Sequence, residues 1–215
     1  MEELFWKNRV FADDLAEFDT ETHAPKLVSV SCCDARVPQG ELFGNVPGEH
    51  FTVANIGNSV RTRDEEGAPI VAGSVVYPIQ KTDPENIVII GHTHCGAVTA
   101  AYQQVAEGAA DEDHELQNEL DLLRPHVEQG LEQFDAGDYE RAEVITRLVE
   151  YNVDRQVDAL LDHTGDLPLF GVVCDLHGYY PGSVGQVHLV NFNGRRNPEE
   201  LPDALRPNFH RKLDY

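Results

Sequence analysis

The chain is poor in lysine and has no long apolar run, and each shortage excludes a class of partner. Only four of its 16 basic residues are lysine, and 38 aspartate and glutamate residues bring the formal net charge to −22. Nucleic-acid binding needs clustered lysine and arginine against the phosphates, so we expect no nucleic-acid partner. No apolar run approaches the ~18 residues that cross a bilayer, so we expect no membrane-spanning helix.

The first residues, MEELFWKNRV, also lack the basic segment and long apolar region of a secretion signal. This indicates a soluble, cytoplasmic protein. The acidic excess could belong to a disordered tail, but the carboxylates are spread through segments with folded-protein patterns. That distribution favours a protein adapted to a salt-rich cytoplasm, where screening weakens repulsion among carboxylates.

Cysteines are few as well. Cys32, Cys33, Cys95 and Cys174 do not form the dense framework of a small secreted domain. Neighbouring cysteines form only a rare, strained disulfide. The remaining choices for Cys32 and Cys33 are therefore metal binding or plain burial, and we expect Cys174 to be a core residue.

Strand-like and helix-like patterns alternate along the chain. This alternation predicts an α/β domain with a mostly parallel sheet flanked by helices. A length of 215 residues fits one such domain. The expected strands lie at 26–32, 50–55, 85–91, 167–176 and 185–194, and the expected helices at 68–81 (kinked or ended near Pro78), 95–108 and 139–165.

Two further segments are expected to be helical. Near the amino terminus, an arm places four apolar residues near one helical face, and it could pack on a partner subunit or on its own domain. These residues are Leu4, Phe11, Leu15 and Phe18. The acidic segment at about 108–138 is predicted to be a helical surface insertion within the single domain 1–215.

The stretch SCCDARVPQG collects reactive side chains where the first expected strand ends. Side chains two apart in an extended chain share a face, so Cys32, Asp34 and Arg36 can converge. Cys33 is then predicted to point away and to pack inside the protein.

A second reactive cluster, GHTHCGAV, follows the expected strand at 85–91. Sites in α/β folds collect at the carboxyl ends of parallel strands, so His92 and Cys95 should lie near Cys32. Cys95 also opens a helix, whose first amides favour a thiolate. Two thiolates and one imidazole suit zinc and leave a fourth position open, as in catalytic sites. Taken alone, the His-x-x-Cys spacing would often arise by chance, and a lone cysteine at a strand end is more often a small buried apolar residue.

Together these motifs resemble those of the β-class carbonic anhydrases. CCDAR is similar to the family's Cys-x-Asp-x-Arg motif, and GHTHCGAV to its Gly-His-x-x-Cys-Gly block. The resemblance extends to PGEHFTVANIGNSV, GSVVYPIQ, VEYNVDRQVDALL and LFGVVCDLHG. It excludes only the acidic segment and the last twenty or so residues.

The resemblance implies reversible hydration of carbon dioxide to bicarbonate and a proton by zinc-bound hydroxide. It implies one zinc ion per chain with Cys32, His92 and Cys95 as ligands. Asp34 and Arg36 would form the catalytic dyad. In the family, the aspartate either pairs with the arginine or rotates to become the fourth ligand.

The resemblance also implies a substrate pocket and an assembly. Phe51, Ile56 and Tyr77 would line the carbon dioxide pocket, some of them contributed by a neighbouring subunit. Gly96 would offer its backbone N–H to the substrate. The expected working unit is a homodimer or a dimer of dimers.

Two other functions fit the same motifs. One is a related zinc hydrolase acting on carbonyl sulfide or carbon disulfide. The geometry of the access channel and the oligomeric state would decide between these substrates and carbon dioxide. The other is a non-catalytic bicarbonate-binding zinc protein. The pairing of Asp34 with Arg36 argues against this last function, because a purely structural site has no need of it.

Overall fold

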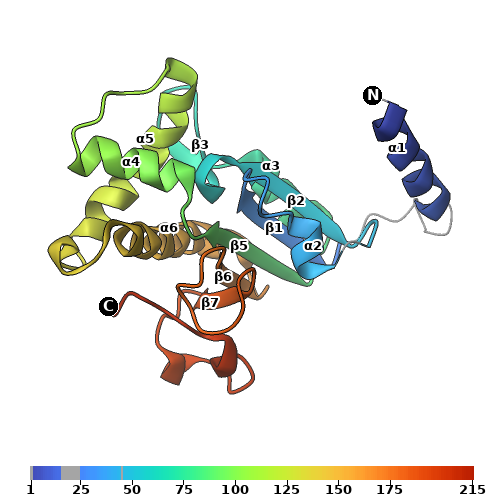
Figure 1. The fold of residues 1–215 in the computed structure, drawn as a ribbon. Helices are drawn as coiled ribbons and strands as arrows, with labels where there is room; N and C mark the ends of the chain where they lie inside the picture. The colour runs from blue at the N-terminus through green and yellow to red at the C-terminus, as the bar shows by residue number, and fades with distance from the viewer. Residues whose placement is uncertain (1, 16–24, 45) are drawn as a thin grey trace.

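A five-stranded sheet organises the fold, and the computed structural model describes residues 2–15, 25–44 and 46–215. The strands are β1 (Leu27–Cys32), β2 (His50–Asn55), β5 (Asn86–His92), β6 (Leu169–Cys174) and β7 (Val187–Phe192). They lie in the order β2-β1-β5-β6-β7, and only β7 runs antiparallel to its neighbour (Figure 1). The predicted mostly parallel sheet is confirmed.

The helices follow the alternation that the sequence predicts. They are α1 (Glu2–Leu15), α2 (Gln39–Phe43), α3 (Gly73–Lys81), α4 (Gly96–Ala106), α5 (His114–Leu131) and α6 (Arg141–Thr164). A short 3-10 turn, η1 (Ile56–Asn58), follows β2, and a small hairpin of β3 (Arg61–Arg63) and β4 (Pro69–Val71) follows the turn. This hairpin was not expected, and its second strand, β4, lies where we placed the start of the helix predicted at 68–81.

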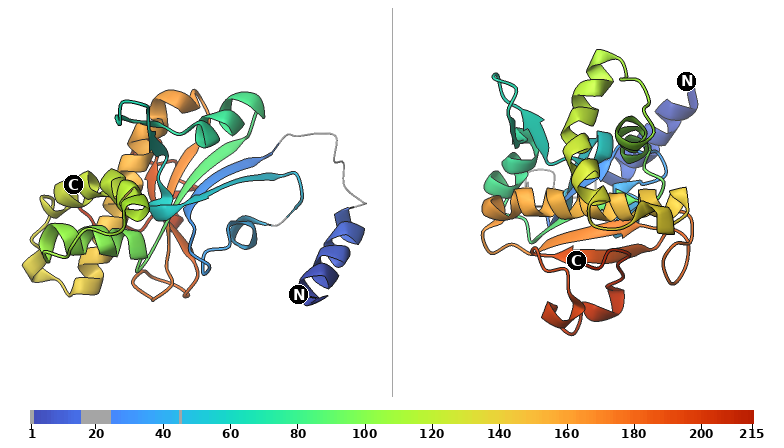
Figure 2. Two further views of the ribbon diagram at one scale, coloured as in Figure 1. Left: turned by 90° about the horizontal axis from the view of Figure 1, so that it is seen from above. Right: turned by 90° about the vertical axis from the view of Figure 1, so that its left-hand side faces the viewer.

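The strand β5 shows why the sheet is covered on both faces. Its side chains alternate between the two faces, and every one of them from Ile87 onward is buried. Ile87 and Ile89 join the core under α3, α4, α5 and α6, whereas Val88 and Ile90 join a smaller core on the opposite face. In the right-hand view of Figure 2, α6 lies on one side of the sheet and the C-terminal segment on the other.

Close packing of α6 on the sheet depends on Gly91. A Cβ atom at this position would lie 2.7 Å from Val153 and 2.8 Å from Val149, both on α6. The absence of a side chain therefore lets the helix approach β5 immediately before His92. This contact fixes the carboxyl end of β5 against a long, rigid element.

The acidic segment differs in part from our expectation. It is helical as predicted, but α5 is not confined to the surface. Leu120, Leu123 and Val127 follow one another at helical spacing and are buried in the main core, where α5 packs on α4 and α6. The predicted surface position was wrong because acidic residues dominate the composition of this segment, while its apolar residues form a narrow stripe along one face of α5.

The helix α1 lies apart from the rest of the chain in both figures. Its side chains Phe5, Trp6 and Phe11 are more than half exposed. Phe18, which we assigned to the same helical face, is outside the described residues. Among the described residues, no helix combines the length and apolar composition needed to cross a bilayer.

The C-terminal segment is anchored on two buried carboxylates of α6. Glu150 accepts hydrogen bonds from the backbone N–H groups of Lys212 and Leu213. Asp154 is paired with Arg211 and accepts a hydrogen bond from the Tyr215 hydroxyl. These last residues therefore belong to the packed domain, although they lie beyond the motifs that carry the family resemblance.

Candidate metal centre

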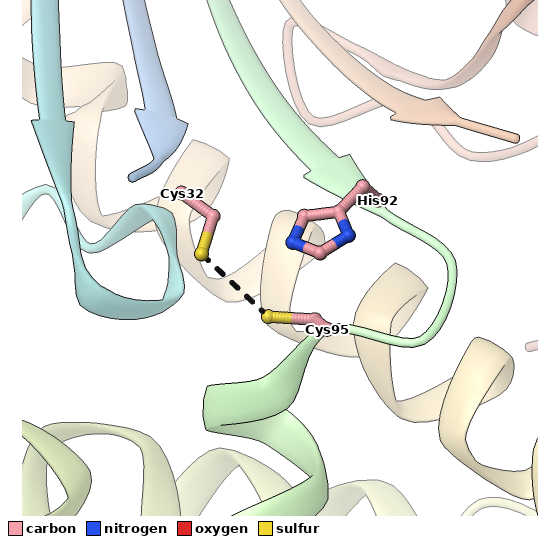
Figure 3. Close-up of side chains that lie close together, drawn as sticks. All are labelled: Cys32, His92 and Cys95. Atoms are coloured by element: carbon pink, nitrogen blue, oxygen red, sulfur yellow. Dashed lines mark hydrogen bonds between the residues drawn. The ribbon is translucent and has the colours of Figure 1, made fainter. Parts of the chain in front are cut away.

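Three potential ligands meet at the carboxyl edge of the sheet. Cys32 is the last residue of β1, His92 is the last residue of β5, and Cys95 caps the amino terminus of α4. Because β1 and β5 are parallel neighbours, their ends lie side by side. The ligand atoms of the three side chains lie within 4.8 Å of one another, and all three are buried (Figure 3).

The spacing of the two sulfur atoms suits zinc. Cys32 Sγ and Cys95 Sγ are 3.9 Å apart, whereas a tetrahedral zinc ion with bonds of about 2.3 Å would set them about 3.8 Å apart. A disulfide would need about 2 Å, and both cysteines are free. The donor set therefore fits a metal ion rather than a cross-link.

The orientation of His92 also suits a metal. Its Nδ1 lies 3.0 Å from the carbonyl oxygen of Thr93, so Nδ1 carries the proton and donates it there. Its Nε2 is buried and has no hydrogen-bond partner among the described residues. A buried nitrogen lone pair without a donor is costly unless a cation binds it.

Backbone groups hydrogen-bond both sulfurs. Gly57 donates to Cys32, and Ala97 and Val98, in the first turn of α4, donate to Cys95. The Cys95 thiol also donates to Cys32, which lowers the pKa of Cys32. The same interaction, together with burial, raises the pKa of Cys95. The sulfur atoms of Cys32 and Cys95 thus share one proton. A metal cation bound to both sulfurs would replace that proton.

Asp34 and Arg36 lie beside the three ligands and form a two-point ion pair. Arg36 Nε lies 2.9 Å from Asp34 Oδ1, and its second nitrogen lies 2.7 Å from Oδ2. The guanidinium holds the pKa of Asp34 well below its usual range. Asp34 Oδ2 is 3.6 Å from His92 Nε2. In this structure the aspartate is therefore turned toward Arg36, in the first of its two expected orientations.

The prediction for Cys33 was wrong, and that for Cys174 is confirmed. Cys33 is exposed, whereas Cys174 is buried. The chain leaves β1 after Cys32 and enters a turn in which the Val37 N–H bonds the Asp34 carbonyl. Strand alternation therefore no longer applies at Cys33, and Asp34 meets Arg36 through a turn rather than on a strand face.

A mostly apolar cavity of about 250 Å³ adjoins Cys32 and Asp34. Two of the four predicted pocket residues, Ile56 and Gly96, line it. Its remaining lining residues are Cys33, Ala97, Ala100, Leu116 and Leu120. Sequence reasoning missed the last two because they belong to α5, although their spacing of four residues placed them on one helical face.

The other two predicted pocket residues, Phe51 and Tyr77, do not line this cavity. Their ring centroids are 6.3 Å apart, and Tyr77 is 53% exposed. Only Ile56 and Gly96 of the predicted set are therefore brought to the cavity within one chain.

The loop between the ligands is held by a second loop that follows β6. The ring of His94 stacks on that of His177, with centroids 3.7 Å apart, and His94 Nε2 lies 3.1 Å from the Tyr179 hydroxyl. Thr93 Oγ1 lies 2.8 Å from His177 Nδ1. These contacts brace the segment from His92 to Cys95, whose residue His94 has a positive φ of 55°.

Similar sequences are found among known proteins. The chain is 32% identical over 107 residues to the chloroplastic β-carbonic anhydrase 5 of Arabidopsis thaliana, a match that covers 49% of this chain and 35% of that protein. It is 32% identical over 130 residues to a carbonic anhydrase of Emericella nidulans, covering 60% and 52%. The matches thus span about a third to a half of these relatives.

The fold is also similar to solved structures. A tetrameric β-carbonic anhydrase from Sordaria macrospora aligns with a TM-score of 0.70 and 20% identity, covering 88% of this chain and 96% of that one. The family model described as carbonic anhydrase matches residues 27–175. This chain therefore belongs to the carbonic anhydrase family.

Proposed function

We propose that this protein binds one zinc ion per chain and catalyses the reversible hydration of carbon dioxide to bicarbonate and a proton. One observation carries the proposal: a buried Cys32–His92–Cys95 set lies beside an arginine-held carboxylate at a small apolar cavity. A bound zinc ion supplies Lewis acidity, which makes water a nucleophile near neutral pH.

Each residue then has a role set by its position. Asp34, kept ionised by Arg36, accepts a hydrogen bond from the attacking water species and so orients its lone pair. The cavity beside it, walled by Ile56 and by Leu120 of α5, suits a small apolar molecule such as carbon dioxide. The N–H of Gly96, which lines the same cavity at the start of α4, would bond an oxygen of the product.

We assign Phe51 and Tyr77 to the pocket of a neighbouring subunit. Support for this arrangement is the exposure of Tyr77 and of the apolar residues Phe5, Trp6 and Phe11 on α1. The assembly would be a homodimer or a dimer of dimers, with α1 packed on the partner. Its surroundings would be the salt-rich cytoplasm that the charge of −22 suggests.

Stopped-flow measurement of carbon dioxide hydration tests the proposal. Protein loaded with zinc should accelerate hydration, and a chelator that removes the zinc should abolish the acceleration. The same preparation is then offered carbonyl sulfide and carbon disulfide. Turnover of these compounds without hydration of carbon dioxide would overturn the assignment, as would a zinc-loaded protein that turns over none of the three.

A further inference from the structure

A buried hydrogen-bond network joins α6 to the turn η1, beside Cys32. Asn152 of α6 lies at its centre and is 1% exposed. Its Nδ2 donates to the carbonyl oxygen of Gly57 at 3.0 Å and to Oδ1 of Asn58 at 3.3 Å. A single side chain on a rigid helix thus contacts two consecutive residues of the turn.

The orientation of Asn152 is itself fixed. Its Oδ1 accepts hydrogen bonds from His126 Nδ1 of α5 at 2.9 Å and from Gln156 Nε2 at 3.0 Å. Gln156 in turn accepts a bond from the N–H of Val60, just after the turn, at 2.9 Å. Both the donor and acceptor ends of the Asn152 amide are therefore engaged, and it cannot rotate without breaking several buried bonds.

The turn needs such support because its backbone is unusual. Gly57 and Asn58 have φ angles of 73° and 48°, both in the left-handed region. A Cβ atom at Gly57 would lie 2.4 Å from a methyl group of Leu123, so α5 packs directly against the turn. Glycine adopts this region freely, but a left-handed asparagine costs free energy, which contacts such as the hydrogen bond from Asn152 to Asn58 offset.

Cys32 pairs with Asn55 between β1 and β2, and the N–H of Cys33 donates to the Asn55 carbonyl oxygen at 2.8 Å, so the turn begins directly beside Cys32. The Gly57 backbone hydrogen-bonds the Cys32 sulfur, which helps to lower the pKa of that thiol. In Figure 3 the turn that follows β2 lies beside Cys32. Binding a metal ion through Cys32 and Cys95 requires two negative sulfurs 3.9 Å apart in a buried site. A fixed N–H dipole aimed at one of them stabilises that charge.

We propose that Asn152 is a positioning residue for the metal centre: it holds η1 so that the Gly57 N–H stays directed at the Cys32 sulfur. The inference rests on the proposed zinc site and names a residue that touches neither metal nor substrate. Asn152 acts through the turn, with Gln156 and His126 setting its orientation.

The test compares Asn152→Ala with a matched control, Asn191→Ala. Asn191 is also fully buried, and its Nδ2 bonds Asp154 of the same helix, but it lies on β7. Each purified protein is titrated with zinc against a competing chelator, and its sulfur-to-cobalt charge-transfer band is recorded after cobalt substitution. We expect Asn152→Ala to bind zinc about 10- to 100-fold more weakly. Its band should shift to lower energy, because a sulfur without its N–H donor gives up charge more easily.

The outcomes separate this inference from the proposed function. A wild-type protein that neither binds zinc nor shows the band overturns the metal centre and the inference with it. If the wild type binds zinc and Asn152→Ala matches it in affinity and band energy, only the inference is overturned. Equal losses in Asn152→Ala and Asn191→Ala also overturn it, because the effect would then be one of general stability.

A measurement on the unaltered protein decides the question if Asn152→Ala does not fold. The wild type is loaded with a spin-active cadmium isotope, and scalar coupling from the metal to amide protons is recorded by NMR. A hydrogen bond to a ligating sulfur transmits this coupling. Coupling to the Gly57 amide proton supports the inference, and its absence from that proton overturns it.

Discussion

Asp34 and Arg36 face each other through two nearly parallel hydrogen bonds, of 2.9 and 2.7 Å, only two residues apart. The backbone N–H of Arg36 adds a third bond to Asp34 Oδ1 at 2.9 Å. Such a fork-to-carboxylate geometry fixes direction as well as charge. The carboxylate next to the three metal-site residues is therefore held as one unit with its arginine.

This unit predicts a strongly non-additive pair of mutations. Asp34→Ala and Arg36→Ala should each lower kcat for carbon dioxide hydration by about a hundredfold while zinc content stays unchanged. The double variant should be little slower than either single one, because the second change removes nothing further. Stopped-flow kinetics on all four proteins provides the measurement. Losses that multiply would mean that the two residues act separately.

The cysteines should differ sharply in their effect on zinc. Cys32→Ser and Cys95→Ser should lose the metal, because a hydroxyl is a poor substitute for a thiolate. Cys33→Ser is the matched control, since Cys33 adjoins Cys32 but is exposed. Metal analysis of the purified proteins should find about one zinc per chain in the wild type and in Cys33→Ser. Retention by Cys32→Ser together with loss by Cys33→Ser would contradict the ligand assignment.

Glu150 should make stability depend on pH. Burial raises the pKa of this carboxyl to about 7 from an ordinary 4.5. Folding therefore favours its protonated form, and the stability it contributes is complete below pH 4.5 and is lost as the pH rises to 7. The unfolding free energy of the wild type minus that of Glu150→Gln should fall by about 3 kcal/mol across this window.

Urea unfolding of both proteins at several pH values measures this difference. Comparing the two proteins cancels His126, whose pKa is lowered to about 4 by burial and whose contribution has the opposite sign. A difference that does not change with pH would show that Glu150 stays ionised in the folded protein.

The acidic composition predicts stabilisation by salt. Lowering the salt concentration from 1 M to 0.1 M lengthens the Debye length from about 3 to about 10 Å. Repulsion within a chain of charge −22 should then lower the melting temperature. A thermal melt followed at several concentrations of potassium chloride tests this expectation. A melting temperature that stays constant or rises at low salt would count against salt adaptation.

The exposed apolar side chains of α1 predict a role in assembly. Replacing Trp6 and Phe11 by aspartate should lower the mass measured by light scattering, because both side chains would lose their place on a partner subunit. Lys7→Gln is the control, since Lys7 is exposed on the same helix and pairs with Glu3 of that helix. An unchanged assembly in the double variant would remove α1 from the interface.

The sequence alone determined the class of fold and the place of the candidate metal centre. Apolar runs such as β5 and the helical periodicity of α6 are local patterns, and their alternation leaves few arrangements other than a mostly parallel sheet. Because such strands end at one edge, the positions of Cys32 and His92 at strand ends were enough to predict that they meet.

Only the tertiary structure decided those features that depend on contacts between distant residues or on irregular segments of the chain. Cys33 is exposed because the chain turns directly after β1, where strand periodicity ceases to apply. Leu120 reaches the cavity only because α5 packs across α4, and no local pattern shows that contact. Asn152 and Gly57 are 95 residues apart. Their hydrogen bond arises from the folding of α6 against η1, and periodicity within either segment carries no information about it.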